Sequence, residues 1–219
     1  PVRWLRRGVV SAIVMLVTAW MAMHFVPLPA RLLAPPPPAT SFEDCRGRPL
    51  RTVTQADGFD RPVPYEGLPR ALVEATLAAE DRRFWDHHGI DWRASTRALI
   101  DWVRHRRVVS GGSTITQQVI KLCDPRPRTV PTKLQEAVQA WRLEQLWDKP
   151  RILAAYVNRL DYGNLCLGPA EAARFYFGKP LAEITVPEAA FLAGLPQAPG
   201  RLNPVRHPDR ARKRQQWIL

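Results

Sequence analysis

The sequence predicts one mainly α-helical domain behind an N-terminal apolar segment. Apolar residues recur at three- and four-residue steps through most of the chain after Leu68. About 150 residues of this pattern are enough for a single hydrophobic core, and no internal repeat is visible. The N-terminal segment differs from the rest because eighteen residues, Val9–Val26, include His24 as their sole ionisable member.

The N-terminal segment predicts a membrane anchor. Residues 1–8 form a basic tail. Residues 9–26 are about as short as a transmembrane helix can be, and Pro27 ends the predicted helix. Basic residues before the span predict a cytoplasmic N-terminus and an extracytoplasmic domain. A cleaved signal peptide is the alternative, although no Ala-x-Ala site follows the apolar run.

Residues 27–59 are expected to form a linker that ends in a small hairpin. Pro35–Pro38 favours a stiff, extended polyproline spacer. The alternating stretch Leu50–Thr54 predicts a strand, and Asp57-Gly58 is a turn signal.

Residues 60–219 contain the predicted helical domain. Its helices are signalled by an apolar stripe around Leu72, a second stripe from Lys133 to Lys149, and start or stop signals further along the chain. The start signals are Pro150, Pro169 and the capping box Thr185-x-x-Glu188, and the stop signal is Gly178. The chain ends inside an apparent helix, so we expect a longer protein beyond Leu219.

Glu80 is the first candidate for chemistry. One and two helical turns before it lie Leu77, Thr76 and Val73, an almost wholly apolar stripe. A carboxylate on such a face resists ionisation, and a carboxyl group of this kind can serve as a general base or acid near neutral pH. The alternative is that Glu80 ends its helix and points into water.

Glu136 is the second candidate. It shares a helix face with Ala140, Leu143 and Trp147, while Lys133 lies three residues before it. Paired carboxylates on apolar faces suggest acid–base chemistry on a sugar or a phosphate ester. An ordinary surface ion pair between Glu136 and Lys133 remains the alternative.

Between the two glutamates lies the run Gly111–Gln118, GGSTITQQ. Glycines allow close approach to a ligand, and a helix capped by Ser113 or Thr114 would offer N–H groups to an anion. A proline-interrupted cationic segment follows, and it suits a phosphate clamp or a solvated loop. Its cations are Lys121, Arg126, Arg128 and Lys133.

These motifs together resemble glycosyltransferase family 51. The resemblance is carried by EDRRFWDHHGID at Glu80–Asp91, GGSTITQQ, Lys133–Glu136 and KPRILAAYVN at Lys149–Asn158, in the family's order and spacing over roughly residues 60–219. The family contains the peptidoglycan glycosyltransferases, found alone or as the amino-terminal domain of class A penicillin-binding proteins. It implies a lysozyme-like fold with two lobes and a cleft between them.

The resemblance also assigns roles. Glu80 matches the catalytic base toward the acceptor sugar's 4-hydroxyl, and Glu136 the second essential glutamate, which helps to hold the donor's diphosphate. No cofactor is implied with certainty, although a divalent cation, Mg²⁺ or Mn²⁺, at Glu136 would fit the family. The substrate-binding residues implied are Arg97, Ser113, Thr114, Gln117, Gln118, Lys121, Arg128 and Lys133. One position departs from the family pattern, since Thr132 stands where an arginine is usual.

The implied reaction is polymerisation of lipid II into glycan strands, with inversion and release of undecaprenyl diphosphate. The implied location is the bacterial inner membrane, with one span and the domain on the periplasmic side. Partners would be lipid II, the growing strand and cell-wall synthesis proteins. The alternatives are a lytic, lysozyme-like enzyme and a catalytically silent scaffold for wall assembly.

The formal net charge of +12 fits this substrate better than it fits nucleic acid. The sequence contains no nucleic-acid-binding motif. Binding to anionic lipid headgroups and to a diphosphate substrate would explain the excess of basic residues. The three cysteines argue against a full disulfide framework, although Cys123 and Cys166 would be able to pair in an oxidising compartment.

Overall fold

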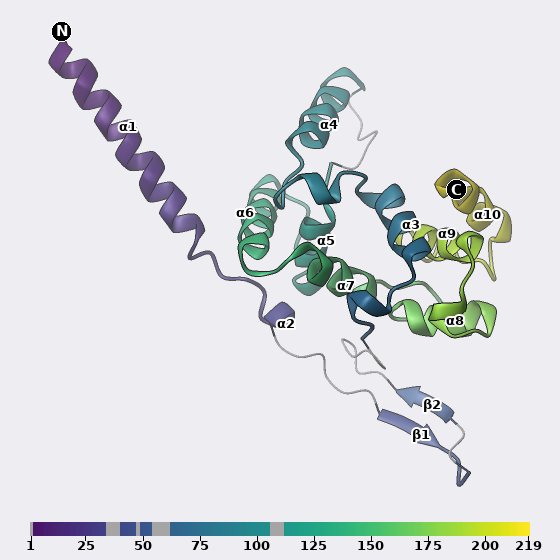
Figure 1. The fold of residues 1–219 in the computed structure, drawn as a ribbon. Coiled ribbons are helices and arrows are strands. Elements are labelled where there is room, and N and C mark those ends of the chain that lie inside the picture. Colours follow the sequence, from purple (N-terminus) through teal and green to yellow (C-terminus); the bar gives the residue numbers. More distant parts are fainter. Residues whose placement is uncertain (1, 34–39, 47–48, 54–61, 106–111) are drawn as a thin grey trace.

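The computed structural model describes residues 2–33, 40–46, 49–53, 62–105 and 112–219, and within these ranges the chain is mainly α-helical (Figure 1). This confirms the prediction of a mainly α-helical chain. The α-helices are α1 (Val2–Met23), α2 (Ala30–Leu33), α3 (Arg70–Glu80), α4 (Trp92–His105), α5 (Ile115–Cys123), α6 (Val130–Leu146), α7 (Lys149–Arg159), α8 (Pro169–Phe177), α9 (Val186–Gly194) and α10 (Pro208–Ile218). Short 3₁₀ turns lie at Tyr65–Gly67, Phe84–Asp86, Leu181–Glu183 and Leu195–Gln197.

Helix α1 extends away from the other helices (Figure 1). It starts at Val2 and therefore includes the basic tail, and it ends at Met23, before the predicted limit of Val26. Among the residues that the structure describes, no helix is both long enough and apolar enough to cross a bilayer. The predicted transmembrane anchor over residues 9–26 is therefore not confirmed.

The segment after α1 packs against α6. The His24 ring meets the Trp141 ring edge-on, with 4.9 Å between centroids, and Gln139 Nε2 donates a 2.7 Å hydrogen bond to the Pro27 carbonyl. Polar residues recur on one face of α6 at Gln135, Gln139 and Arg142, a pattern typical of a solvent-exposed face. Gln139 is instead almost wholly buried, because the linker covers it.

Strands β1 (Thr40–Glu43) and β2 (Pro49–Val53) form an antiparallel hairpin. The strand predicted at Leu50–Thr54 is present, but its partner precedes it in the chain. The turn signal Asp57-Gly58 and the polyproline stretch Pro35–Pro38 lie outside the described residues.

Local signals fix several helix ends as predicted. Gly178 ends α8 in the left-handed conformation, at φ 65°. Thr185 and Glu188 form the reciprocal capping box of α9. The α5 cap is Thr114, whose hydroxyl accepts a hydrogen bond from the Gln117 N–H.

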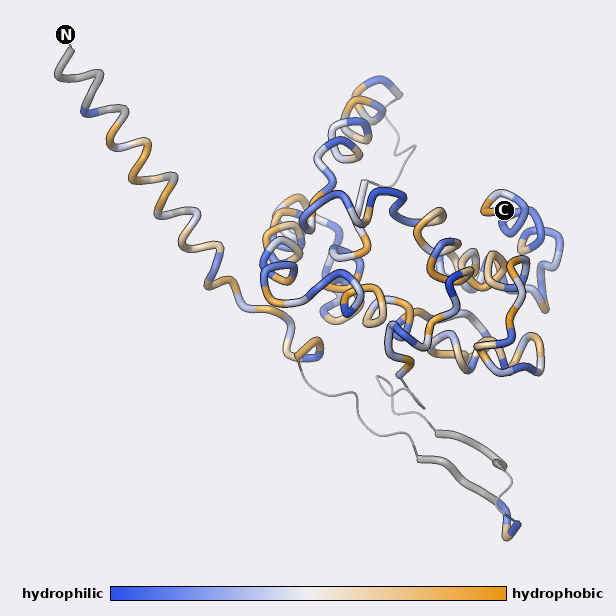
Figure 2. Tube along the Cα trace, in the orientation of Figure 1, coloured by the Kyte–Doolittle hydropathy of each residue, from blue (hydrophilic) through white to orange (hydrophobic). Residues whose placement is uncertain are grey.

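The core lies where α5 packs between α6 and α7, and where α3 packs on α9. Figure 2 shows apolar residues on these inner helices and mostly hydrophilic residues along α10, which covers α9. Burying apolar surface supplies most of the stability of such a domain. The largest fully buried apolar and aromatic side chains are Tyr156, Tyr162, Phe84, Leu72, Ile115, Ile120, Leu143, Ile152, Leu153, Leu192 and Leu195.

Cys123 and Cys166 are buried as separate thiols, so the structure does not contain the disulfide between them that the sequence left open. Burial raises the pKa of the Cys166 thiol to about 11.

Gly89 fixes the distance between the turn after α3 and α6. Its φ is +78°, and a Cβ there would lie 2.7 Å from the backbone of Ala140. We therefore expect Gly89→Ala to lower the free energy of unfolding by about 3 kcal/mol or more, because strain and a backbone clash add. Chemical denaturation measures this. Gly200→Ala, where a Cβ meets nothing within 4 Å, is the matched control. Equal stability of the two variants would contradict the packing described.

Candidate active site

Glu80 is the last residue of α3, and its carboxyl group is half-buried. Gln118 Nε2, on α5, donates a 3.0 Å hydrogen bond to Glu80 Oε2. Burial raises the pKa of Glu80 above its ordinary value, and the nearby Asp81 charge adds to the rise, while the Gln118 bond and the Arg214 charge oppose it. The carboxyl group thus has the environment that the apolar stripe predicted.

Tyr156 sets the orientation of Gln118. The Tyr156 hydroxyl, on α7, donates to Gln118 Oε1 at 3.0 Å, so the amide nitrogen faces Glu80. Burial raises the pKa of Tyr156 well above its usual value, which keeps the phenol protonated and donating. Three helices therefore hold the Glu80 carboxylate in one geometry.

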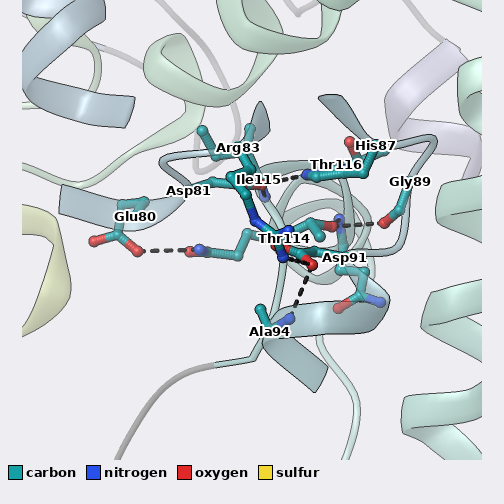
Figure 3. Close-up of polar contacts among 12 residues, drawn as sticks. Glu80, Asp81, Arg83, His87, Gly89, Asp91, Ala94, Thr114, Ile115 and Thr116 are labelled. Atoms are coloured by element: carbon teal, nitrogen blue, oxygen red, sulfur yellow. Dashed lines mark hydrogen bonds and ion pairs between the residues drawn. The ribbon is translucent and has the colours of Figure 1, made fainter. Parts of the chain in front are cut away.

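Asp81 points to the other side of the turn and serves the scaffold (Figure 3). Its buried Oδ2 accepts a 3.0 Å hydrogen bond from the Ile115 N–H at the start of α5 and lies 3.0 Å from His87 Nε2. The His87 ring thus supports the turn after α3. Asp81 therefore ties the end of α3, which carries Glu80, to the helix that carries Gln118.

A second scaffold contact lies in the same turn. Asp91 caps α4 by accepting from the Ala94 N–H at 2.9 Å, and it pairs with Arg83. The Thr114 hydroxyl donates to the Gly89 carbonyl at 2.7 Å (Figure 3). The residues between Asp81 and Asp91 thus hold the start of α5 in place.

Beside this turn, α5, α6 and the loop between them line a cavity of about 700 Å³ that is open to solvent. Gln118 belongs to its wall, so the amide that holds Glu80 also borders the cavity. The structure brings together most of the residues that the sequence predicted. The lining residues are Ser113, Gln117, Gln118, Lys121, Arg126, Arg128, Thr129, Val130, Thr132, Lys133 and Glu136.

Glu136 is 8% exposed at the cavity wall. Lys133 Nζ lies 3.1 Å from Glu136 Oε2 and donates a 2.7 Å hydrogen bond to Ser113 Oγ. The ion pair therefore lies at the cavity wall, with the Glu136 carboxylate buried and the Lys133 side chain half exposed. The Lys133 ammonium group links Ser113, just before α5, to Glu136 on α6.

Cations dominate the rest of the cavity wall. Within the described part of the chain, Lys121 and Arg128 have no carboxylate partner, whereas Arg126 pairs with Asp124. Thr132, at the position where the family usually has arginine, lies 2.9 Å from the Thr129 hydroxyl in the first turn of α6. The side chain at that position therefore completes a helix cap and carries no charge.

Two predicted binding residues lie elsewhere. Thr114 is 2% exposed and uses its hydroxyl for the α5 cap and the Gly89 carbonyl, so it supports the site without reaching the cavity. Arg97 lies on α4 and borders a separate hollow of about 510 Å³ with Trp92 and Arg104. The structure does not bring Arg97 to the cavity.

The lining of the cavity has too few carboxylates to hold a divalent metal without oxygen ligands from the substrate. Glu136 is the one carboxylate among its lining residues, and one of its oxygens already accepts from Lys133. Mg²⁺ and Mn²⁺ prefer several oxygen ligands, and no cluster of three or more Asp, Glu, His or Cys side chains occurs in the described ranges. We therefore assign no step to a metal.

Comparison with known proteins places this site in a family. A family model described as Transglycosylase matches residues 46–219, which include Glu80, Glu136 and the whole cavity. The chain belongs to the transglycosylase family. Residues 46–219 are thus a peptidoglycan glycosyltransferase domain, as the sequence motifs implied.

Penicillin-binding proteins are among the relatives of this transglycosylase domain. The chain is 42% identical to penicillin-binding protein 1A of Aquifex aeolicus over 185 residues, which is 84% of the chain and 25% of that protein. It is 39% identical to penicillin-binding protein 1C of Escherichia coli over 202 residues, 92% of the chain and 26% of that protein. The chain thus spans about a quarter of the length of these relatives.

Two residues of the transglycosylase site were not predicted from sequence. Tyr156 lies on the buried face of α7, and nothing in the local sequence indicates that its hydroxyl reaches Gln118. Arg214 acts on Glu80 from α10. It is 134 positions further along the chain, so no spacing rule connects the two.

Proposed function

We propose that the domain polymerises lipid II into peptidoglycan glycan strands by inverting glycosyl transfer and releases undecaprenyl diphosphate. One observation carries the proposal. A half-buried carboxyl group is held by the amide that borders a cavity lined with cations. The arrangement provides a base and an anion site side by side.

The base is Glu80. In the proposed reaction its carboxylate accepts the proton of the acceptor's 4-hydroxyl while that oxygen attacks the anomeric carbon of the donor. Burial raises the pKa of Glu80, which makes the carboxylate a stronger base than an exposed glutamate. The hydrogen bond from Gln118 leaves Oε1 available to the acceptor.

The leaving group is the diphosphate, and the cavity supplies its counter-charges. Lys121 and Arg128 have no carboxylate partner in the described residues, so their charges are available to an anion. Lys133 lies between Glu136 and Ser113 and adds a third positive charge to those of Lys121 and Arg128. Prearranged cations of this kind stabilise negative charge that develops in the transition state.

The proposal includes the setting of the reaction. The homology to penicillin-binding proteins supports work at the cell envelope, with lipid II, the growing strand and cell-wall synthesis proteins as partners. The lysozyme-like arrangement of two lobes, implied by the family, is part of the same proposal.

Substrate choice tests the function. We expect the purified protein to consume lipid II and to leave finished, uncrosslinked glycan intact, because a hydrolase of uncharged bonds does not need the cation-lined wall. Gel separation of strands and chromatography of the lipid products measure both. Cleavage of the glycan would establish the lytic alternative, and no turnover of either would favour the silent scaffold.

Lys121→Ala should lower kcat/KM for lipid II by about 10-fold to 100-fold, since it removes a charge that contacts the departing diphosphate. Initial rates at several lipid II concentrations measure the change. Arg206→Ala, which removes an exposed cation outside the cavity, is the matched control. Equal losses in the two variants would show that net charge, and not the cavity, governs the rate.

A further inference from the structure

Glu144 of α6 is a buried carboxylate that lies outside the lining of the cavity. We propose that Glu144 is a positioning residue, which fixes the rotation of α5 and thereby holds the Gln118 amide in its direction toward Glu80. The proposal rests on the proposed function, in which Glu80 is the base. Glu144 acts through α5 and does not touch the reacting atoms.

One oxygen of Glu144 joins three helices. The Thr116 hydroxyl, on α5, donates a 2.5 Å hydrogen bond to Glu144 Oε1, and the Lys149 ammonium, at the start of α7, lies 2.9 Å from the same oxygen. The Glu144 side chain is 2% exposed and that of Lys149 is 17% exposed. Charge-assisted hydrogen bonds withdrawn from water are strong, because little solvent competes for them. The cluster of Thr116, Glu144 and Lys149 is therefore a fixed point for the start of α5.

Thr116 and Gln118 lie on nearly opposite faces of α5. Two residues along an α-helix correspond to a rotation of about 200°, so a bond that holds Thr116 against α6 also sets the direction of Gln118. Gln118 Nε2 donates to Glu80 Oε2 at 3.0 Å. A polar atom about 6 Å from the helix axis moves by about 2 Å when the helix turns by about 20°, which is enough to break such a hydrogen bond.

The same oxygen also sets the start of α7. Lys149 is the first residue of that helix, and Tyr156 follows two turns later on the same face. The Lys149 ammonium also lies over the Phe84 ring of the turn after α3, 4.4 Å from the ring centroid. The Tyr156 hydroxyl donates to Gln118 Oε1. Glu144 therefore aligns both partners of that hydrogen bond, Gln118 through α5 and Tyr156 through α7.

An ion pair that served stability alone would be a poor choice at this place. Glu144 Oε2 is buried and has no hydrogen-bond partner in the described residues. An unpaired carboxylate oxygen costs stability, and apolar side chains that replace a buried ion pair often stabilise a protein as well or better. The charged cluster supplies a direction that an apolar contact does not, because hydrogen bonds are directional and the hydrophobic effect is not.

Thr116→Val tests the proposal because it removes the hydroxyl, keeps the shape of the side chain and leaves the ion pair between Glu144 and Lys149 intact. We expect kcat for lipid II polymerisation to fall by about 10-fold to 100-fold, since a base displaced by about 1 Å loses activity on this scale. Thr116→Ser, which restores the hydroxyl, should recover most of the loss. Tyr162→Phe is the matched control. It removes another buried hydroxyl, bonded to the Val157 carbonyl at 3.3 Å, and should retain full kcat.

Glu144→Gln separates positioning from stability. The amide oxygen still accepts from Thr116, but the amide NH₂ group takes the unpartnered place of Oε2, and Lys149 loses its counter-charge. This variant should therefore unfold at a lower urea concentration than Thr116→Val and yet have the higher kcat. If kcat instead followed stability across Glu144→Gln, Thr116→Val and Tyr162→Phe, the cluster would be merely structural and the proposal would be overturned.

NMR of the Gln118 side-chain amide is a readout that does not depend on activity. Its signal in ¹⁵N-labelled protein is assigned through Gln118→Ala. We expect its NH₂ protons to exchange with water about tenfold faster in Thr116→Val than in the wild type, because a hydrogen bond to Glu80 is lost. Equal exchange in the two proteins would overturn the proposal. A wild-type protein that does not polymerise lipid II would refute the proposed function, and the exchange measurement would still decide the role of Glu144.

Discussion

Glu80→Gln is expected to fold like the wild type and to polymerise lipid II about 10²-fold to 10⁴-fold more slowly. Glutamine is nearly isosteric and can still accept the hydrogen bond from Gln118, but it cannot take a proton from the acceptor hydroxyl. Polymer formation is measured on gels, beside a thermal unfolding curve for each protein. Glu74→Gln, an exposed glutamate on the same helix, is the matched control and should retain full activity.

The same variant has a predicted effect on stability. The pKa of Glu80 is raised in the folded protein above the ordinary value of 4.5, so the folded state retains this proton to higher pH than the unfolded state does. Wild-type stability therefore falls as pH rises from about 4.5 through the folded pKa. Glu80→Gln lacks this loss and should melt higher than the wild type at pH 8, with the difference vanishing near pH 4. A difference that grows toward low pH would contradict the assigned burial effect.

Asp81→Ala is expected to lower the free energy of unfolding by about 2–5 kcal/mol. The substitution leaves the Ile115 N–H and the His87 ring nitrogen, both buried, without their carboxylate. In a chain of this size, that loss corresponds to a fall of about 5–15 °C in melting temperature. Urea denaturation and calorimetry measure both quantities.

Asp86→Ala is the control for Asp81, because it removes an exposed carboxylate from the same turn. Its stability should match that of the wild type. Asp81→Asn, which keeps one oxygen acceptor, should lie between the two. If Asp81→Ala were as stable as Asp86→Ala, the link between the end of α3 and the start of α5 would not be the support of Glu80 that we describe.

Signals that act within a few residues predicted the fold well. The capping box at Thr185 and Glu188, the left-handed Gly178 and the cap at Thr114 are each set by local backbone geometry. The sequence therefore placed these helix ends where the structure has them. The apolar stripe below Glu80 likewise predicted burial and its effect on the carboxyl pKa.

Contacts between distant segments were beyond such rules. Gln139 looks like part of a solvated face until the linker at Pro27 covers it. Thr114 was expected in the cleft wall, but packing against Gly89 turned its hydroxyl inward. The partner of β2 and the approach of Arg214 to Glu80 depend in the same way on tertiary packing, for which periodicity carries no information.

The motifs predicted the site better than the helix pattern did. Most of the implied substrate-binding residues line one cavity, because α5, whose first turns carry Thr116, Gln117 and Gln118, packs against α6 beside the cationic loop that joins the two helices. Thr114 and Arg97 are the exceptions, and the more distant of the two along the chain is Arg97. It lies on α4, whose connection to α5 includes residues outside the described ranges, and its role in donor binding stays a prediction.

The products that the wild-type protein makes from lipid II alone provide the most direct test of the account. If Glu80 activates the acceptor and the cation-lined cavity takes the leaving group, one undecaprenyl diphosphate appears for every glycosidic bond formed, and strands lengthen in step. Counting the released lipid against the bonds by mass spectrometry measures this ratio. Release of undecaprenyl diphosphate together with free sugar, and no strands, would contradict the account, because water would then be the acceptor.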